Sequence, residues 1–218
     1  MTTEIKTMIG LVLVCVAILA GGAYFYQNNS GALPTVLESN QEALVREDSI
    51  KIKAENEKLV VVEFADFQCP ACAAVAPYVK QLADEYKDEV TFVFRDFPLT
   101  NIHRNAVKSA QMARIANEQG KYMEMSEKLY SNQSEWGSAS NPSDFFLRYA
   151  QEIGMNTDGL KEKLDSDIYR DQINADVRDA DLLGVNSTPT FFVGNTIIRT
   201  ANYQQVREAI DAQLAATQ

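Results

Sequence analysis

The stretch "LVVVEFADFQCPAC", residues 59–72, decides how this chain is interpreted. Its first half is a nearly continuous run of apolar and β-branched residues, which is typical of a central strand covered on both faces. Its second half places Cys69 and Cys72 two residues apart, where we expect a helix to begin. The cysteine pair could be part of a metal site, a structural disulfide or a redox centre.

Metal binding and a structural bridge are both disfavoured. A structural zinc site needs four ligands, and outside the apolar N-terminal segment the chain offers only Cys69, Cys72 and His103 as cysteine or histidine ligands. We therefore expect no metal and no other cofactor. A disulfide that closes two intervening residues constrains little chain entropy, so a purely structural bridge is a weak explanation.

A redox centre explains the position of the pair. Unpaired N–H groups and the helix dipole stabilise a thiolate at a helix N-terminus, and Pro70 suits the first helical turn because its missing N–H is no loss there. Cys69 is the predicted nucleophile. Cys72, one turn further, is the predicted resolving thiol that attacks the mixed disulfide and releases the partner.

The surrounding pattern predicts strands separated by helices. Alternation and β-branched residues indicate further strands at 49–52 and 90–97, and Gly194-Asn195 is a hairpin signal between two short strands. Between them lies a long helical block, in which Asn141-Pro142 and Gly154 mark the start and stop of one helix. The predicted order is β, β, α, β, helical block, β, β, α.

"VVVEFADFQCPAC" and the later "GVNSTPTFFVGN" (184–195) together resemble the thioredoxin superfamily, specifically the DsbA-like thiol:disulfide oxidoreductases. The resemblance covers about residues 50–215. It implies an α/β thioredoxin fold, with a central mixed sheet flanked by helices and a helical subdomain inserted at about residues 100–184.

The resemblance also implies roles for particular residues. Glu63 would be a partly buried carboxylate beneath the pair, with a raised pKa, that exchanges a proton with the resolving thiol. The alternative for Glu63 is a strand-end glutamate facing water. Thr188-Pro189 resembles the cis-proline turn beside the redox pair, where the Thr188 backbone would pair with an extended substrate segment. Without that context, an X-Pro bond is expected to be trans.

Other residues near the pair are expected to contact substrate. Phe67, Gln68 and Pro70 would line the substrate groove beside Cys69, whereas His103 and Trp136 are interpreted as structural. The chain departs from the strongly oxidising members of the family, because Pro-Ala stands between the cysteines where those members carry a histidine.

The N-terminal segment predicts that the rest of the chain lies outside the cytoplasm. Ile9 to Tyr26 is an uncharged run long enough to span a bilayer, preceded by Lys6 on the positive side. We expect residues 1–26 to be a single-pass membrane anchor, or alternatively a secretory signal that is cleaved. Residues 27–46 would then be a linker and residues 47–218 the thioredoxin-like domain.

A formal net charge of −10 argues against affinity for nucleic acid. We predict an extracytoplasmic enzyme that introduces disulfides into cysteine-containing secreted or surface proteins, with a membrane redox partner that resets the cysteine pair. A disulfide reductase or isomerase of the same fold is the alternative enzyme. A chaperone-like binding module with an inert cysteine staple is the alternative of another class.

Overall fold

The computed structural model describes residues 41–199 and 202–216, most of which belong to one compact unit that begins at Glu42. The predicted anchor at residues 1–26, and the linker as far as residue 40, lie outside the described residues. Within the described part of the chain, no helix has both the length and the apolar character needed to cross a membrane.

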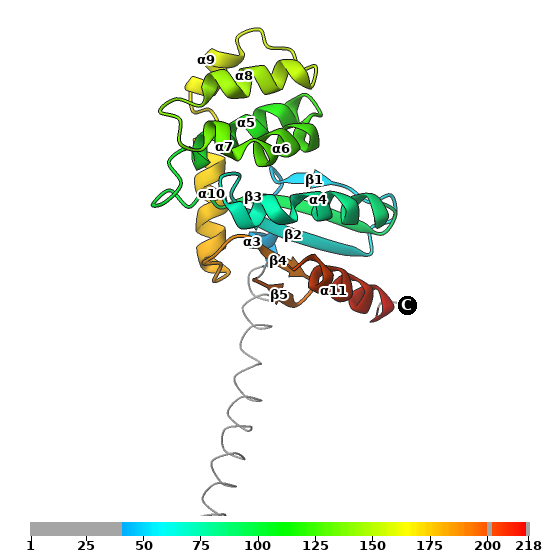
Figure 1. Ribbon diagram of the computed structural model, residues 1–218. Coiled ribbons are helices and arrows are strands. Elements are labelled where there is room, and N and C mark those ends of the chain that lie inside the picture. Colours follow the sequence, from blue (N-terminus) through cyan, green and yellow to red (C-terminus); the bar gives the residue numbers. More distant parts are fainter. Residues whose placement is uncertain (1–40, 200–201, 217–218) are drawn as a thin grey trace, which may run out of the picture. The chain divides into compact units, whose positions relative to one another are not determined.

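A mixed five-stranded sheet forms the centre of the unit, in the order β1-β3-β2-β4-β5 (Figure 1). β2 and β3 run parallel, and the other neighbouring pairs are antiparallel. This arrangement confirms the predicted mixed sheet, with the strand that leads to the cysteines in the middle. The strands are β1 (Ile50–Ile52), β2 (Leu59–Ala65), β3 (Val90–Asp96), β4 (Thr190–Val193) and β5 (Thr196–Ile198).

Helices cover both faces of the sheet. α4 (Pro70–Glu85) and α11 (Tyr203–Ala216) contact each other and share one apolar core with the strands. α10 (Arg170–Leu182) packs against β3 and contacts α5 (Figure 1). The remaining helices are α3 (Gln41–Leu44), α5 (Ala106–Glu118), α6 (Tyr122–Ser131), α7 (Gln133–Trp136), α8 (Ser143–Glu152) and α9 (Leu160–Asp165).

The block between β3 and β4 builds a second apolar core of its own. Trp136, Phe146 and Tyr149 are among the largest fully buried side chains, and Trp136 packs edge-on against Phe146. The predicted helix between Asn141-Pro142 and Gly154 is present as α8, and Gly154 has a φ of +73°, a left-handed value that ends helices well because glycine has no Cβ. The hairpin signal is also confirmed, since Gly194, with a φ of +54°, connects β4 to β5.

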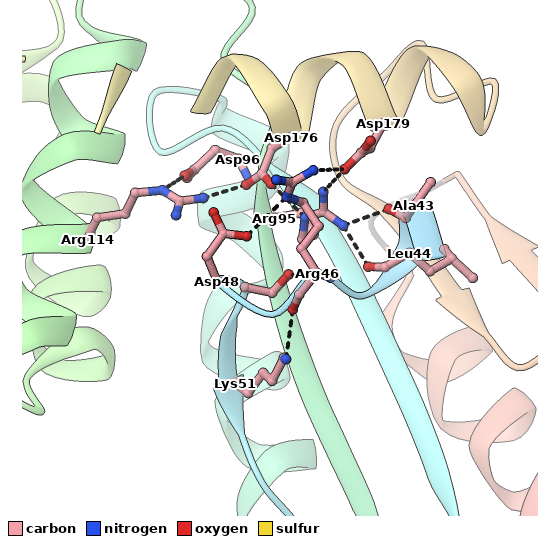
Figure 2. A network of polar contacts seen from close by, with 11 residues as sticks. Ala43, Leu44, Arg46, Asp48, Lys51, Arg95, Asp96, Arg114, Asp176 and Asp179 are labelled. Carbon is pink, nitrogen blue, oxygen red and sulfur yellow. Dashed lines mark hydrogen bonds and ion pairs between the residues drawn. The ribbon is translucent and has the colours of Figure 1, made fainter. Parts of the chain in front are cut away.

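β3 differs from the alternating pattern that predicted it, because all seven of its residues are buried. Its charged member, Arg95, is satisfied by ion pairs to two residues of α10, Asp176 at 2.8 Å and Asp179 at 2.6 Å (Figure 2). The same guanidinium donates to the carbonyls of Ala43 and Leu44, each at 2.7 Å. Arg95 thus binds the end of α3 to the sheet and to α10.

A second arginine extends this network into the helical block. Arg114 of α5 pairs with Asp96, the last residue of β3, and with Asp176, both at 2.5 Å (Figure 2). Asp176 is therefore held between two buried arginines, and its Oδ2 also accepts from the Asp96 backbone N–H at 3.0 Å. The network joins β3, α5 and α10 around buried charges that compensate one another.

Candidate active site

The cysteine pair lies at the start of α4, as predicted. Cys69 is the N-cap residue, with φ −74° and ψ 123°, and Pro70 opens the helix. The Ala73 N–H donates to the Cys69 carbonyl at 3.1 Å, which closes the first turn. Both thiols are free, and the residues are 7% and 1% exposed for Cys69 and Cys72. The first cysteine is the accessible one of the two, although less exposed than a surface residue.

The two thiols differ in acidity because their surroundings differ. A hydrogen bond from Cys72 is the largest cause that lowers the pKa of Cys69, to about 5, and the backbone N–H groups of Ala71 and Cys72 act in the same direction. Burial is the largest cause that raises the pKa of Cys72, followed by its bond to Cys69 and the negative charge of Glu63. The pair therefore consists of one thiolate and one thiol at neutral pH.

Glu63 lies on the sheet beneath this pair. It occupies β2 on the same side as Val61, the side that packs against α4, and is 6% exposed. Burial alone raises its pKa to about 8. The water-facing alternative for Glu63 is therefore wrong, and the raised pKa agrees with the expectation from the family resemblance.

A small cavity of about 20 Å³ adjoins Glu63, between α4 and α6. Tyr122 and Tyr130 line it together with Ser126. A space of this size is large enough for one water molecule, which requires roughly 10–15 Å³. Glu63 thus lies beside a small cavity that polar side chains line in part.

The Thr188-Pro189 bond is cis, as the resemblance implied. The Cys69 sulfur lies 3.6 Å from the Thr188 carbonyl, which accepts a hydrogen bond when the Cys69 thiol is protonated, so this turn lies directly beside the redox pair. Pro189 is buried and leads into β4, which pairs with β2 through Phe64 and Thr190. The pairing of β4 with β2 explains why two distant segments of the chain, at Cys69 and Thr188, meet at one point.

The three residues expected to line the substrate groove differ in exposure and in the contacts they make. Phe67 does not line an open groove, because it is 4% exposed and packs against Tyr122 and Tyr130 in the core of the helical block. Gln68 is half-buried and uses its carboxamide in bonds to the helical block. Pro70 is exposed beside Cys69, where a bound chain could contact it.

Asp66 is a residue that sequence reasoning missed. It is buried, and its carboxylate accepts from the backbone N–H groups of Gln68 at 2.7 Å and Leu99 at 2.8 Å. It also contacts the His103 Nδ1 at 2.7 Å. His103 therefore lies against Asp66, in keeping with the interpretation of His103 as structural. Asp66 also connects the active-site turn, residues 66–69 before α4, to the loop after β3. An aspartate directly after a buried strand was the available signal.

The helical block holds the same turn from its other side. Gln133, the first residue of α7, donates to the carbonyls of Phe67 at 2.7 Å and Cys69 at 3.0 Å. Trp136, interpreted as structural, is fully buried and donates its indole N–H to the Leu129 carbonyl. Sequence reasoning missed Gln133, since nothing in its neighbourhood distinguishes it from a surface glutamine.

These features define a class of protein. A thioredoxin-like sheet, an acidic thiol at a helix N-cap and a buried resolving thiol are the parts of a thiol:disulfide oxidoreductase. Among the described residues, no group of three or more histidine, cysteine, aspartate or glutamate side chains could hold a metal ion.

Comparison with known proteins gives the family. The chain belongs to the thioredoxin family, whose model, described as "Thioredoxin", matches residues 46–212. The structure is similar to the thiol-disulfide exchange protein alpha-DsbA2 from Wolbachia pipientis, with a TM-score of 0.73, 20% identity, and coverage of 85% of this chain and 97% of that one. It is also similar to a periplasmic thioredoxin-like protein from Salmonella enterica serovar Typhimurium, with a TM-score of 0.64, 22% identity, and coverage of 80% and 95%.

One relative found by sequence is named as an antiporter and not as a thioredoxin-like protein. The chain is 40% identical over 135 residues, or 62% of its length, to Na(+)/H(+) antiporter NhaA 3 from Salinispora tropica. The match spans only 20% of that antiporter. The two proteins therefore share one region, and the antiporter activity named for the whole relative does not follow for this chain.

Proposed function

We propose that this protein is an extracytoplasmic oxidase of protein thiols, which introduces disulfides into secreted or surface proteins through Cys69 and Cys72. The observation that carries the proposal is the stabilised Cys69 thiolate, with its pKa near 5, beside a buried Cys72 whose pKa is raised. Stabilising one thiolate stabilises the reduced form of the pair, and the disulfide form is then the better oxidant.

In the proposed reaction each residue takes one step. A substrate thiolate attacks the Cys69 sulfur of the oxidised pair, and the Cys69–Cys72 bond breaks. Cys72 leaves as a thiolate, and Glu63, which at neutral pH is largely protonated, can supply its proton. A second substrate thiolate then attacks the substrate sulfur of the mixed disulfide. The substrate leaves with a new disulfide, and Cys69 leaves as a thiolate that needs no proton.

Substrate is held at the Thr188 turn. The Thr188 residue is half-buried next to Cys69, and an extended segment that pairs with its backbone would bring a substrate cysteine to the Cys69 sulfur. Pro70 supplies an exposed apolar surface beside the same sulfur. We infer that recognition depends mainly on backbone pairing, so that substrates of varied sequence are accepted.

Location and resetting follow from the same proposal. The uncharged run from Ile9 to Tyr26 supports a single-pass anchor with the domain outside the cytoplasm, and secretion after signal cleavage is the alternative. After each cycle the cysteine pair holds two electrons. A membrane redox partner that accepts them would return the pair to the disulfide form.

A reductase or isomerase is the second candidate, and one specific observation favours it. The negative charge of Glu63, once it ionises, raises the pKa of Cys72 and disfavours the thiolate form of the reduced pair at high pH. The Pro-Ala dipeptide also lacks the histidine of the strongly oxidising members of the family. Both features moderate the oxidising strength without reversing the effect of the Cys69 thiolate.

Turnover of a dithiol peptide separates the candidates. The purified domain, in a glutathione buffer, should oxidise a peptide with two cysteines many times per molecule, and Cys69→Ser should abolish this turnover. An oxidase should also be mostly oxidised in growing cells. Reduction of a disulfide peptide with no oxidation of the dithiol peptide, together with a mostly reduced pair in cells, would support the reductase instead.

A further inference from the structure

Two glutamine side chains fasten the active-site turn to the helical block. The Gln133 carboxamide has two N–H donors, and it uses its nitrogen to bind the carbonyls of Phe67 at 2.7 Å and Cys69 at 3.0 Å. These carbonyls flank Gln68. One side chain of the helical block therefore spans the whole turn that leads into α4.

The turn reaches back with its own glutamine. Gln68 donates to the Gly137 carbonyl at 2.9 Å and accepts from the Asn105 backbone N–H at 2.9 Å. The Asn105 side chain in turn donates to the carbonyls of Trp136 and Ala139, each at 2.9 Å. The end of the helix that begins at Gln133 is thus fixed to the turn and to the start of α5.

Gly137 shows how closely this segment is packed. A Cβ at Gly137 would lie 2.7 Å from the Gln133 backbone carbonyl and 3.6 Å from the Gln68 carboxamide nitrogen. Such a short distance to backbone leaves no room for a side chain. The hydrogen bonds that Gln68 and Gln133 make between the turn and the helical block therefore depend on a glycine at position 137.

The held turn carries the reactive sulfur. Cys69 has no side-chain capping bond to α4, so its placement depends on its backbone. The Cys69 carbonyl accepts from the Ala73 N–H and from Gln133. The backbone N–H groups of Ala71 and Cys72 stabilise the Cys69 thiolate and help to lower its pKa. A small rotation of the turn would move the sulfur away from these donors, whose effect falls off within the first turn of a helix.

We propose that Gln133 is a positioning residue of the helical block that holds the Phe67–Cys69 turn so that the Cys69 sulfur faces the first N–H groups of α4. The block then does more than cover the site, because it sets the strength of the thiolate as nucleophile and leaving group. This role rests on the proposed function, since it acts through thiol–disulfide exchange at Cys69.

The test compares two methionine variants of the full-length protein. Gln133→Met keeps the length of the side chain and removes both donated bonds. Gln119→Met is the control, because Gln119 also belongs to the helical block and its carboxamide also makes two bonds to backbone, one donated to the Asn156 carbonyl and one accepted from the Asn156 N–H. Thiolate absorbance of the reduced protein is titrated for each, and the equilibrium with glutathione is measured at pH 7.

Gln133→Met should raise the pKa of Cys69 by about one unit and lower the equilibrium constant for oxidation of glutathione about tenfold, since one pKa unit is a factor of ten. Gln119→Met should change neither. If Gln133→Met does not fold, Gln133→Asn carries the test, because its shorter side chain keeps the amide but cannot reach both carbonyls. Equal titrations for all folded variants would overturn the positioning role.

The two proposals fail in different ways. If the unmodified protein exchanges disulfides and its Cys69 titrates near pH 5, but the Gln133 variants behave like the control, only the positioning role is wrong. If the unmodified protein itself exchanges no disulfide with glutathione, the proposed function is wrong.

Discussion

Replacing Glu63 with glutamine should make the folded protein more stable at neutral pH and should change how stability depends on pH. The pKa of Glu63 is raised from 4.5 to about 8 in the folded protein by burial. A raised pKa means that this carboxyl contributes its full stability below pH 4.5 and that the contribution is lost as pH rises toward 8. The amide in Glu63→Gln is neutral at every pH and loses nothing over this range.

The size of the difference in stability between the two proteins follows from the pKa shift of Glu63. Between pH 4.5 and pH 7 the wild-type protein loses roughly 3 kcal/mol relative to Glu63→Gln, at about 1.36 kcal/mol for each pH unit. The difference should level off at about 5 kcal/mol above pH 8. A constant cost of about 1–3 kcal/mol, for burying an amide N–H without a partner, offsets part of this gain at all pH values.

Urea unfolding at a series of pH values measures the difference. Both proteins should carry Cys69→Ser and Cys72→Ser, so that no active-site thiol titrates, and the unfolding free energies are compared from about pH 4.5 to 9. Glu85→Gln is the control, because Arg207 lowers the pKa of Glu85 on the surface and its loss should have no pH-dependent effect above about pH 5. A difference between Glu63→Gln and wild type that stays constant from about pH 5 to 8 would refute the burial argument.

Three further predictions concern the cysteines and the buried ion pairs. Iodoacetamide should label Cys69 with a half-maximal rate near pH 5 and should leave Cys72 unlabelled at neutral pH; equal labelling, found by mass spectrometry, would contradict the assigned roles. Cys72→Ser should accumulate mixed disulfides with substrates, because the Cys69 thiolate can attack a substrate disulfide while no Cys72 thiol is present to attack the mixed disulfide, and a Cys72→Ser protein without adducts in an extract rich in disulfide-bonded substrates would count against the mechanism. Arg95→Met should lower the unfolding free energy by about 3–5 kcal/mol, because it removes a buried partner from two aspartates, whereas Arg46→Met on the surface should cost less than about 1 kcal/mol. A similar urea midpoint for the two arginine variants would show that the buried network does not stabilise the fold.

The local signals in the sequence were enough for the redox pair and the sheet. An apolar strand and a proline at the helix start have short-range physical causes, so Cys69 and Cys72 could be placed from the residues themselves. The hairpin at Gly194 and the limits of α8 were predictable for the same reason. Each depends on backbone preferences of a few residues. The cis turn at Thr188-Pro189 was expected only from the family resemblance, because an X-Pro bond is otherwise expected to be trans.

Features that depend on contacts between distant segments could not be predicted. The alternating pattern predicted a strand at residues 90–97 but not the burial of Arg95 within it, because α10, far along the chain, brings Asp176 and Asp179 over Arg95. Phe67 read as a groove residue because it adjoins the active-site turn, but the helical block supplies Tyr122 and Tyr130 to bury it. Tertiary packing, which leaves no local trace in the sequence, decides both cases.

The reduction potential of the Cys69/Cys72 pair, measured by equilibration with glutathione, tests the proposed direction of electron flow most directly. The pKa of Cys69, near 5, lies between the values of roughly 7 for thioredoxin and 3.5 for DsbA. The potential should therefore fall between about −270 mV and −120 mV, and in the oxidising half of that interval, above roughly −195 mV. A potential at or below about −270 mV would contradict the oxidase and identify the protein as a reductase.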